Sequence, residues 1–145
     1  QPGYAAAAWG TAQHLGAQSA AFWRLGGRLG VSLANRDEGW LAMKVLTMCT
    51  AHLPEDRTLQ GDYARALFTQ GEFRLAAQAA EKAFRMDAPE VGPLQVLADV
   101  MRIERLPGAK MNYESILVLD PGNRHAREEL LAIDREMRNS AEQKL

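Results

Sequence analysis

Residues 70–89, QGEFRLAAQAAEKAFRMDAP, decide the fold of this chain. Gly71 breaks the chain before a helix, and Pro89 ends that helix, because the residue before a proline is pushed out of the α-helical region. Alanines at helical spacing let a neighbouring helix approach closely, with a phenylalanine at either end. The predicted buried face consists of Phe73, Ala76, Ala77, Ala80, Ala83 and Phe84.

The end of this helix recurs later in the chain. Met86-Asp87 is matched 33 residues on by Leu119-Asp120, and a proline follows each pair, at Pro89 and at Pro121. Self-similarity at a period near 34 residues indicates a repeat protein.

The rest of the chain has the same helical character. No strand is expected, since β-branched residues nowhere alternate for long enough. Eight helices are predicted, near residues Tyr4–Leu15, Ala20–Leu33, Asp37–Leu53, Arg57–Thr69, Glu72–Ala88, Val91–Arg102, Pro107–Leu119 and Arg124–Met137. In the last one, a narrow apolar stripe is surrounded by charges, which is typical of the end of a stack.

Composition excludes several classes of function. The 145 residues suit one domain, and 17 basic against 18 acidic residues form no basic stripe, so no nucleic acid partner is expected. The uncharged first 23 residues contain Gln13, His14 and Gln18, and are too polar for direct membrane insertion. Because the chain begins with Gln rather than Met, we expect a processed form or a part of a longer protein.

No residue pattern predicts catalysis. His14, His52 and His125 lie in three different predicted helices, and a metal site needs three or four ligands. The single cysteine, Cys49, excludes an internal disulfide and lies on a buried stripe, which favours a core thiol over a nucleophile. We therefore expect that the chain is not an enzyme and that it has no catalytic residue, cofactor or metal.

The second to seventh helices pair as Ala20–Leu53, Arg57–Asp87 and Glu90–Asp120, and these pairs resemble tetratricopeptide repeats (TPRs). The resemblance covers about 100 residues. In the middle pair it is carried by Tyr63-Ala64, Leu67, Gly71, Phe73, Ala76, Ala80, Ala83 and Pro89. The third pair matches at Val96, Val100, Ala109, Tyr113, Ile116 and Asp120-Pro121. Glu104 replaces the loop glycine there, and the first pair has a turn about four residues longer than usual.

The resemblance implies an all-α fold, a TPR superhelix or α-solenoid of antiparallel helix pairs. The expected single TPR domain, 1–145, divides into an extra N-terminal helix (1–18), an irregular first repeat (19–56), a second repeat (57–89), a third repeat (90–123), a capping helix (124–140) and a frayed tail (141–145).

The resemblance also implies a concave groove that binds a protein. The family's ligand-contacting positions fall on Trp23, Gly27, Gly30, Arg65, Phe68, Thr69, Leu94, Ala98, Met101 and Arg102. Aromatic and arginine side chains are frequent binding anchors. An alternative places Trp23, Leu94 and Met101 against the extra N-terminal helix. Gly26 matches the small position where paired helices touch, so it is expected to be structural.

The partner implied is an amphipathic helix or an apolar extended segment. The Lys/Asn/Arg clamp of TPRs that bind chaperone tails is absent, because its positions hold Trp23, Gly27, Gly61, Arg65, Leu94 and Ala98. The expected function is a non-catalytic scaffold in a bacterial cell-envelope, secretion or exopolysaccharide-export assembly. The sequence does not decide whether this assembly lies in the cytoplasm or the periplasm. A tether to the inner membrane would have to lie outside this sequence.

Two alternatives stay open. One is a secretion chaperone that shields one exported subunit. The other is a homo-oligomerisation module, in which Tyr4, Trp9 and the alanines of the first helix form a homodimer face.

Overall fold

The computed structural model describes residues 2–14, 19–85 and 88–145. Within those ranges the chain forms eight α-helices and no strand, which confirms the all-α prediction. The helices are α1 (Pro2–His14), α2 (Ala20–Ala34), α3 (Gly39–His52), α4 (Arg57–Thr69), α5 (Phe73–Ala83), α6 (Val91–Ile103), α7 (Ala109–Leu119) and α8 (Arg124–Glu142). None of these helices is long and apolar enough to cross a membrane.

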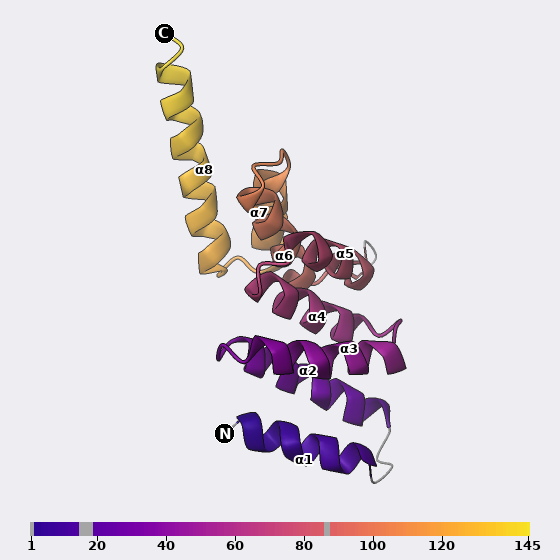
Figure 1. Cartoon of the computed structure of the whole chain (residues 1–145). Helices are drawn as coiled ribbons and strands as arrows, with labels where there is room; N and C mark the ends of the chain where they lie inside the picture. Colours follow the sequence, from indigo (N-terminus) through magenta and orange to yellow (C-terminus); the bar gives the residue numbers. More distant parts are fainter. Residues whose placement is uncertain (1, 15–18, 86–87) are drawn as a thin grey trace.

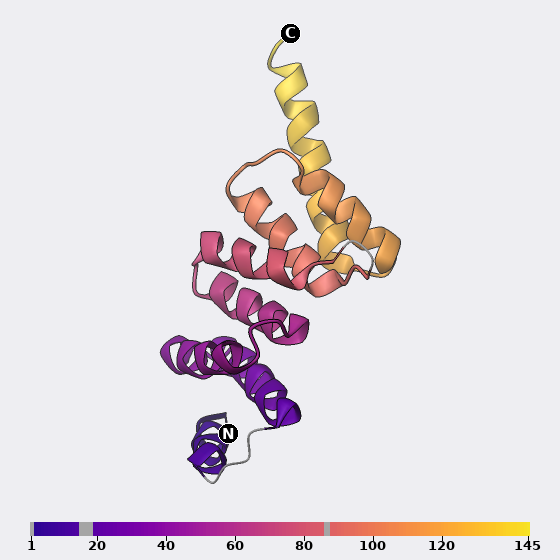
Figure 2. The ribbon, with the colours of Figure 1, turned by 90° about the vertical axis from the view of Figure 1, so that its right-hand side faces the viewer.

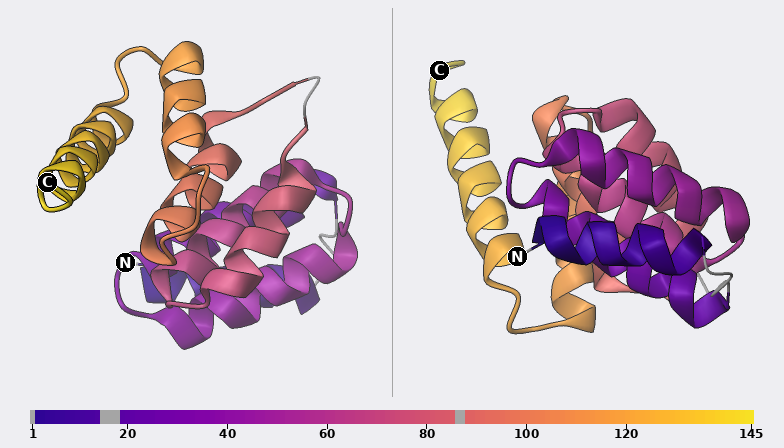
Figure 3. Two further views of the ribbon diagram at one scale, coloured as in Figure 1. Left: turned by 90° about the horizontal axis from the view of Figure 1, so that it is seen from above. Right: turned by 60° about the horizontal axis from the view of Figure 1, so that its bottom comes forward.

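The helices stack in chain order along one direction (Figures 1 and 2). Each packs mainly on its near neighbours in the chain: α2 on α3 and α4, α4 on α5 and α6, and α6 on α7. The apolar core is correspondingly divided into three clusters, the first around Leu46, the second around Ala80 and the third around Tyr113. Viewed from above and from below, α8 lies to one side of the other helices (Figure 3).

The turns after α2, α4 and α6 repeat with a period of 34 residues. Asp37, Gly71 and Arg105 each adopt a left-handed backbone, with φ of 61°, 81° and 56°. The next residue in each turn donates its N–H to a carbonyl five residues earlier, and the three bonds are Glu38 to Leu33, Glu72 to Leu67 and Leu106 to Met101. This is the Schellman arrangement, which satisfies the last carbonyls of a helix.

This period corrects two predictions about the turns. The left-handed position after α6 belongs to Arg105, so Glu104 does not stand in the place of the loop glycine. The turn between α2 and α3 spans residues 35–38, one residue more than the turn between α4 and α5, and not four. The third turn is the longest, because Gly108, with a φ of 106°, delays the start of α7 and leaves Pro107 outside that helix.

The small-residue face of α5 is buried largely as predicted, but the helix is shorter. Ala76, Ala80 and Ala83 are at most 1% exposed, and Ala79, which was not predicted, is also buried. The helix ends at Ala83, and Phe84 turns to extended backbone and packs against the third core cluster. Met86 and Asp87, which carry the sequence recurrence, lie outside the described residues, as does Leu15, the predicted end of the first helix.

The last helix is longer than expected. Asn123 caps α8 by accepting a hydrogen bond from the N–H of Ala126 at 3.0 Å. The helix then continues to Glu142, so the predicted tail, 141–145, begins two residues too early. No glycine or proline follows Arg124 to stop the helix, and the chain therefore stays helical beyond its contact with α7.

Candidate functional site

Five of the ten predicted groove residues are buried between helices. These five are Trp23, Gly27, Gly30, Leu94 and Ala98. The expectation that they line an open groove is wrong, because the faces that carry them pack against neighbouring helices.

Trp23 shows what fills this space. It is 2% exposed, its ring stacks on His52 at a centroid distance of 3.9 Å, and its edge meets Trp9 of α1 at 5.6 Å. The alternative prediction, in which Trp23 packs on the N-terminal helix, is therefore correct. Leu94 instead joins the third core cluster with Tyr113, far along the chain from α1.

Gly27 and Gly30 allow neighbouring helices to pack closely against α2. A Cβ at Gly27 would run into Leu59 of α4, and one at Gly30 would run into Leu46 of α3. Gly26 has the same role, as predicted, since its Cβ would lie 2.6 Å from Cys49 Sγ. The three glycines of α2 thus let the helices on two sides approach its backbone.

Arg65, Phe68 and Thr69 come together at a surface hollow. The hollow has a volume of about 420 Å³ and lies between α4 and α6, beside the end of α2. Its other lining residues are Asn35, Val91, Gly92, Gln95, Val96 and Asp99. We call this hollow the α4/α6 groove.

The α4/α6 groove has an apolar floor and a polar rim. Phe68 is half-buried, with its ring 5.3 Å from that of Phe73, and Val96 belongs to the second core cluster. Asn35, Thr69 and Gln95 bring amide and hydroxyl groups to the rim, and these groups can bond to the backbone of an extended segment. Arg65 is exposed and can pair with a carboxylate.

Sequence reasoning placed α6 at the groove but chose other residues of that helix, and it missed Asn35. Gly92, Gln95 and Asp99 follow one another at helical spacing on a face that also leads to Arg102, so the helical period could have revealed them. Asn35 lies in a turn, and no periodic signal in the sequence points to it.

A second, smaller hollow of about 150 Å³ lies on the other side of Arg65 and contains Asp62. The Oδ2 atom of Asp62 is buried and has no hydrogen-bond partner among the described residues. Burial raises the pKa of Asp62 to about 6, although Arg28 and Arg65 pull it down and Asp56 adds to the rise. This carboxyl group is the least satisfied polar group at the contact of α2 with α4.

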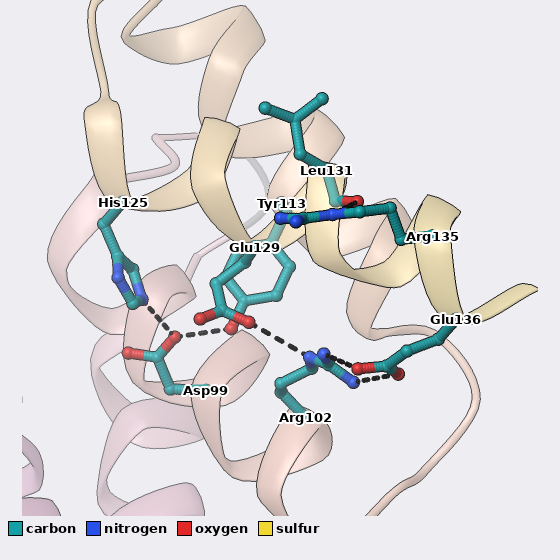
Figure 4. Close-up of polar contacts among 8 residues, drawn as sticks. All are labelled: Asp99, Arg102, Tyr113, His125, Glu129, Leu131, Arg135 and Glu136. Atoms are coloured by element: carbon teal, nitrogen blue, oxygen red, sulfur yellow. Dashed lines mark hydrogen bonds and ion pairs between the residues drawn. The ribbon is translucent and has the colours of Figure 1, made fainter.

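Asp99, which lines the α4/α6 groove, belongs to a polar network that joins α6, α7 and α8 (Figure 4). Asp99 Oδ1 accepts a hydrogen bond from the Tyr113 hydroxyl at 2.6 Å and lies 2.7 Å from His125 Nε2. Burial, and then the bond to Asp99, raise the pKa of Tyr113. His125 is an exposed residue at the start of α8, and it links α8 to α6.

Arg102 belongs to the same network (Figure 4). Its guanidinium donates to Glu129 at 3.0 Å and to both carboxylate oxygens of Glu136, at 2.6 and 2.9 Å. The prediction that Arg102 is free to meet a partner is therefore wrong, because its donors are used to hold α8. Met101, also predicted in the groove, lies instead at a separate cleft beside α8.

Chemically, these arrangements suit binding. Among the described residues, no group of three or more His, Cys, Asp or Glu side chains could hold a metal ion. Burial raises the pKa of the Cys49 thiol to about 12, so the thiol stays protonated at neutral pH. A scan against models of known protein families and a search of curated proteins each find no match to this chain.

Proposed function

We propose that this chain is a TPR-like module that binds a segment of a partner protein in the α4/α6 groove, as part of a larger assembly. The observation that carries the proposal is the meeting of Arg65, Phe68 and Thr69 with the α6 face at one hollow. The 34-residue recurrence of the turns at Asp37, Gly71 and Arg105 supports the TPR-like reading.

The groove chemistry indicates the kind of segment. An apolar side chain would pack on Phe68 and Val96, amides of the segment would bond to Asn35 and Gln95, and a carboxylate would meet Arg65. At about 25 cal/mol per Å² of apolar surface, one buried anchor contributes roughly 2 kcal/mol before ordering costs. Micromolar binding needs roughly 8 kcal/mol, so one anchor is not enough and the contacts to Asn35, Gln95 and Arg65 must add to it. We therefore expect weak, reversible binding of a single segment.

We propose that the larger assembly is a bacterial cell-envelope, secretion or exopolysaccharide-export assembly. Self-association through α1 has less support, because Trp9 is 6% exposed and packs on Phe22. Within that predicted homodimer face, Ala6 is buried as well, and the exposed residues are Tyr4, Ala5, Ala7 and Ala8.

The test uses peptides selected from a displayed library of random segments. Selected peptides are titrated against the wild-type protein and two groove variants, Gln95→Trp, which fills the hollow, and Arg65→Glu, which reverses its charge. Arg74→Glu, on the exposed side of α5, is the matched charge control. The proposal expects both groove variants to weaken binding at least roughly tenfold, with the control unchanged. Equal affinity for all four proteins would contradict it.

A further inference from the structure

A cleft lies between the overhanging end of α8 and the turn that joins α6 to α7. α8 runs antiparallel to α7 and continues beyond it, so its C-terminal end projects from the stack (Figures 1 and 2). The cleft has a volume of about 760 Å³. It shares no lining residue with the α4/α6 groove.

The walls of the cleft carry apolar side chains that lack a covering helix. Met101 and Ile133 are partly buried at its base, and Leu106 of the turn is 47% exposed. Met137, one turn beyond Ile133 on α8, is 59% exposed and lines an adjoining hollow that shares Ile133, Glu136 and Ser140 with the cleft. The spacing of Ile133 and Met137 is that of a ridge on which another helix packs.

Three cations line the cleft, and they differ in how they are neutralised. Arg102 pairs with Glu129 and Glu136, and Lys110 pairs with Asp134 at 2.8 Å. Arg105 forms no ion pair with any residue in the described ranges. Glu129, Asp134 and Glu136 of α8 are thus already paired with Arg102 and Lys110. Arg105 is therefore the cation of the cleft that can pair with a ligand.

The backbone of Arg105 supports a role in binding. Arg105 has a φ of 56°, a left-handed conformation that costs a residue with a Cβ about 1 kcal/mol or more. Gly71 fills the equivalent position after α4 without that cost. Strained residues of this kind gather at functional sites, where the side chain serves a purpose other than stability.

The cleft is also held open before any partner arrives. The bond of Arg102 to both oxygens of Glu136 ties α8 to α6 beside the cleft (Figure 4). The Arg102 hydrogen bonds lower the pKa of Glu136, to which the charge of Arg105 also contributes. A preformed cleft spares a ligand the ordering cost of assembling it.

We propose that this cleft binds an amphipathic α-helix of a partner protein, one that carries a carboxylate beside its apolar ridge. The ridge packs on Leu106, Ile133 and Met137, and the carboxylate pairs with Arg105. This surface is separate from the α4/α6 groove, so it gives the module a second point of attachment within an assembly.

The test uses two synthetic peptides about 18 residues long, which is enough to form a helix. Both carry leucines at positions i, i+3, i+4 and i+7, and one has glutamates beside the leucines where the other has glutamines. Fluorescence anisotropy measures their binding to wild type, Arg105→Gly, Met137→Ser and the control Arg74→Gln. We expect Arg105→Gly to weaken binding of the glutamate peptide roughly fivefold or more without lowering Tm.

The glutamine peptide should bind the wild type more weakly and should not distinguish it from Arg105→Gly. Equal effects of Arg105→Gly and Arg74→Gln would indicate general charge attraction and overturn the proposal, as would no saturable binding to the wild type. Loss of binding to the Arg65→Glu variant would show that the peptide binds in the α4/α6 groove, and would also overturn the proposal. A wild-type dimer in sedimentation that Met137→Ser abolishes would show that a second copy fills the cleft, and would also overturn it.

Discussion

Asp62 of α4 lies directly against Gly27 of α2, where a Cβ would stand 3.0 Å from the buried Oδ2 atom. The two residues meet where the first helix pair of the stack joins the second. Because glycine leaves no side chain between them, a carboxyl group sits close to a helix backbone with nothing to bond it. This contact therefore gives two predictions on stability.

Gly27→Ala should destabilise the protein. The new methyl group would run into Leu59, which is fully buried, and would crowd Asp62. Overpacking of this kind costs about 1–3 kcal/mol. Urea unfolding measures the change. Gly92→Ala is the control: a Cβ there meets nothing within 4 Å, and alanine should add up to about 1 kcal/mol through its helix propensity. An unchanged midpoint for Gly27→Ala would show that the contact of α2 with α4 can relax.

Asp62→Asn should stabilise the protein at neutral pH. The folded pKa of Asp62, about 6, lies above its ordinary value of 3.8, so folding favours the protonated form. The stability from this group is complete below about pH 4 and is lost as pH rises through 6. The full shift corresponds to roughly 3 kcal/mol, and partial exposure reduces the expected gain to about 1–2 kcal/mol.

The pH dependence separates this effect from a general one. The difference between Asp62→Asn and wild type in the free energy of unfolding should be largest at pH 7.5 and small near pH 4. Asp37→Asn, on an exposed turn, serves as the control. A difference that stays constant between these pH values would mean that the pKa of Asp62 is the same in the folded and the unfolded protein, and would contradict the prediction.

Arg105→Gly should raise the free energy of unfolding by about 1 kcal/mol, since glycine adopts the left-handed backbone without strain. Gly71→Ala provides the opposite change at the equivalent turn and should lower stability by a similar amount. Thermal and urea unfolding of both variants check the pair. If Arg105→Gly is destabilising, the arginine side chain makes a contact that supports the fold.

Tyr113→Phe should loosen the contact of α7 with α6. The change removes the 2.6 Å hydrogen bond to Asp99 from a fully buried side chain, at a cost of roughly 1.5–3 kcal/mol for a bond to a charged group. Hydrogen exchange in residues 109–119 should then be faster than in the wild type, with little change in α4. Tyr4→Phe, at a side chain 75% exposed, should have no effect. Exchange that rises equally in every helix would indicate global unfolding and not loosening of α7.

Much of the helical pattern could be predicted from the sequence. The bounds of α4, Arg57–Thr69, were predicted to the residue, because Asp56 caps the helix and Gly71 follows it. The end of α5 was misplaced, since Phe84 fits the helical period but leaves the helix to pack on another core cluster. The helical period of the apolar residues predicts which face of a helix is buried, but it does not predict which neighbouring helix covers that face.

The candidate site was harder to predict for the same reason. Trp23 and Ala98 occupy the expected helices, but their faces point to other helices and not to an open groove. The rotation of each helix about its axis depends on the glycine contacts of α2 and on α1, neither of which a repeat pattern specifies. Arg102 was placed on the correct helix, and its partners on α8 came only from the three-dimensional structure.

The central claim is that the α4/α6 groove binds a protein segment, and chemical-shift mapping tests it most directly. A selected peptide is added to isotope-labelled protein, and the backbone amide shifts are followed by NMR. We predict the largest changes at Phe68, Thr69 and Gln95, with little change in α1 and α3. Changes confined to other helices, with those three amides unmoved at saturation, would contradict the claim.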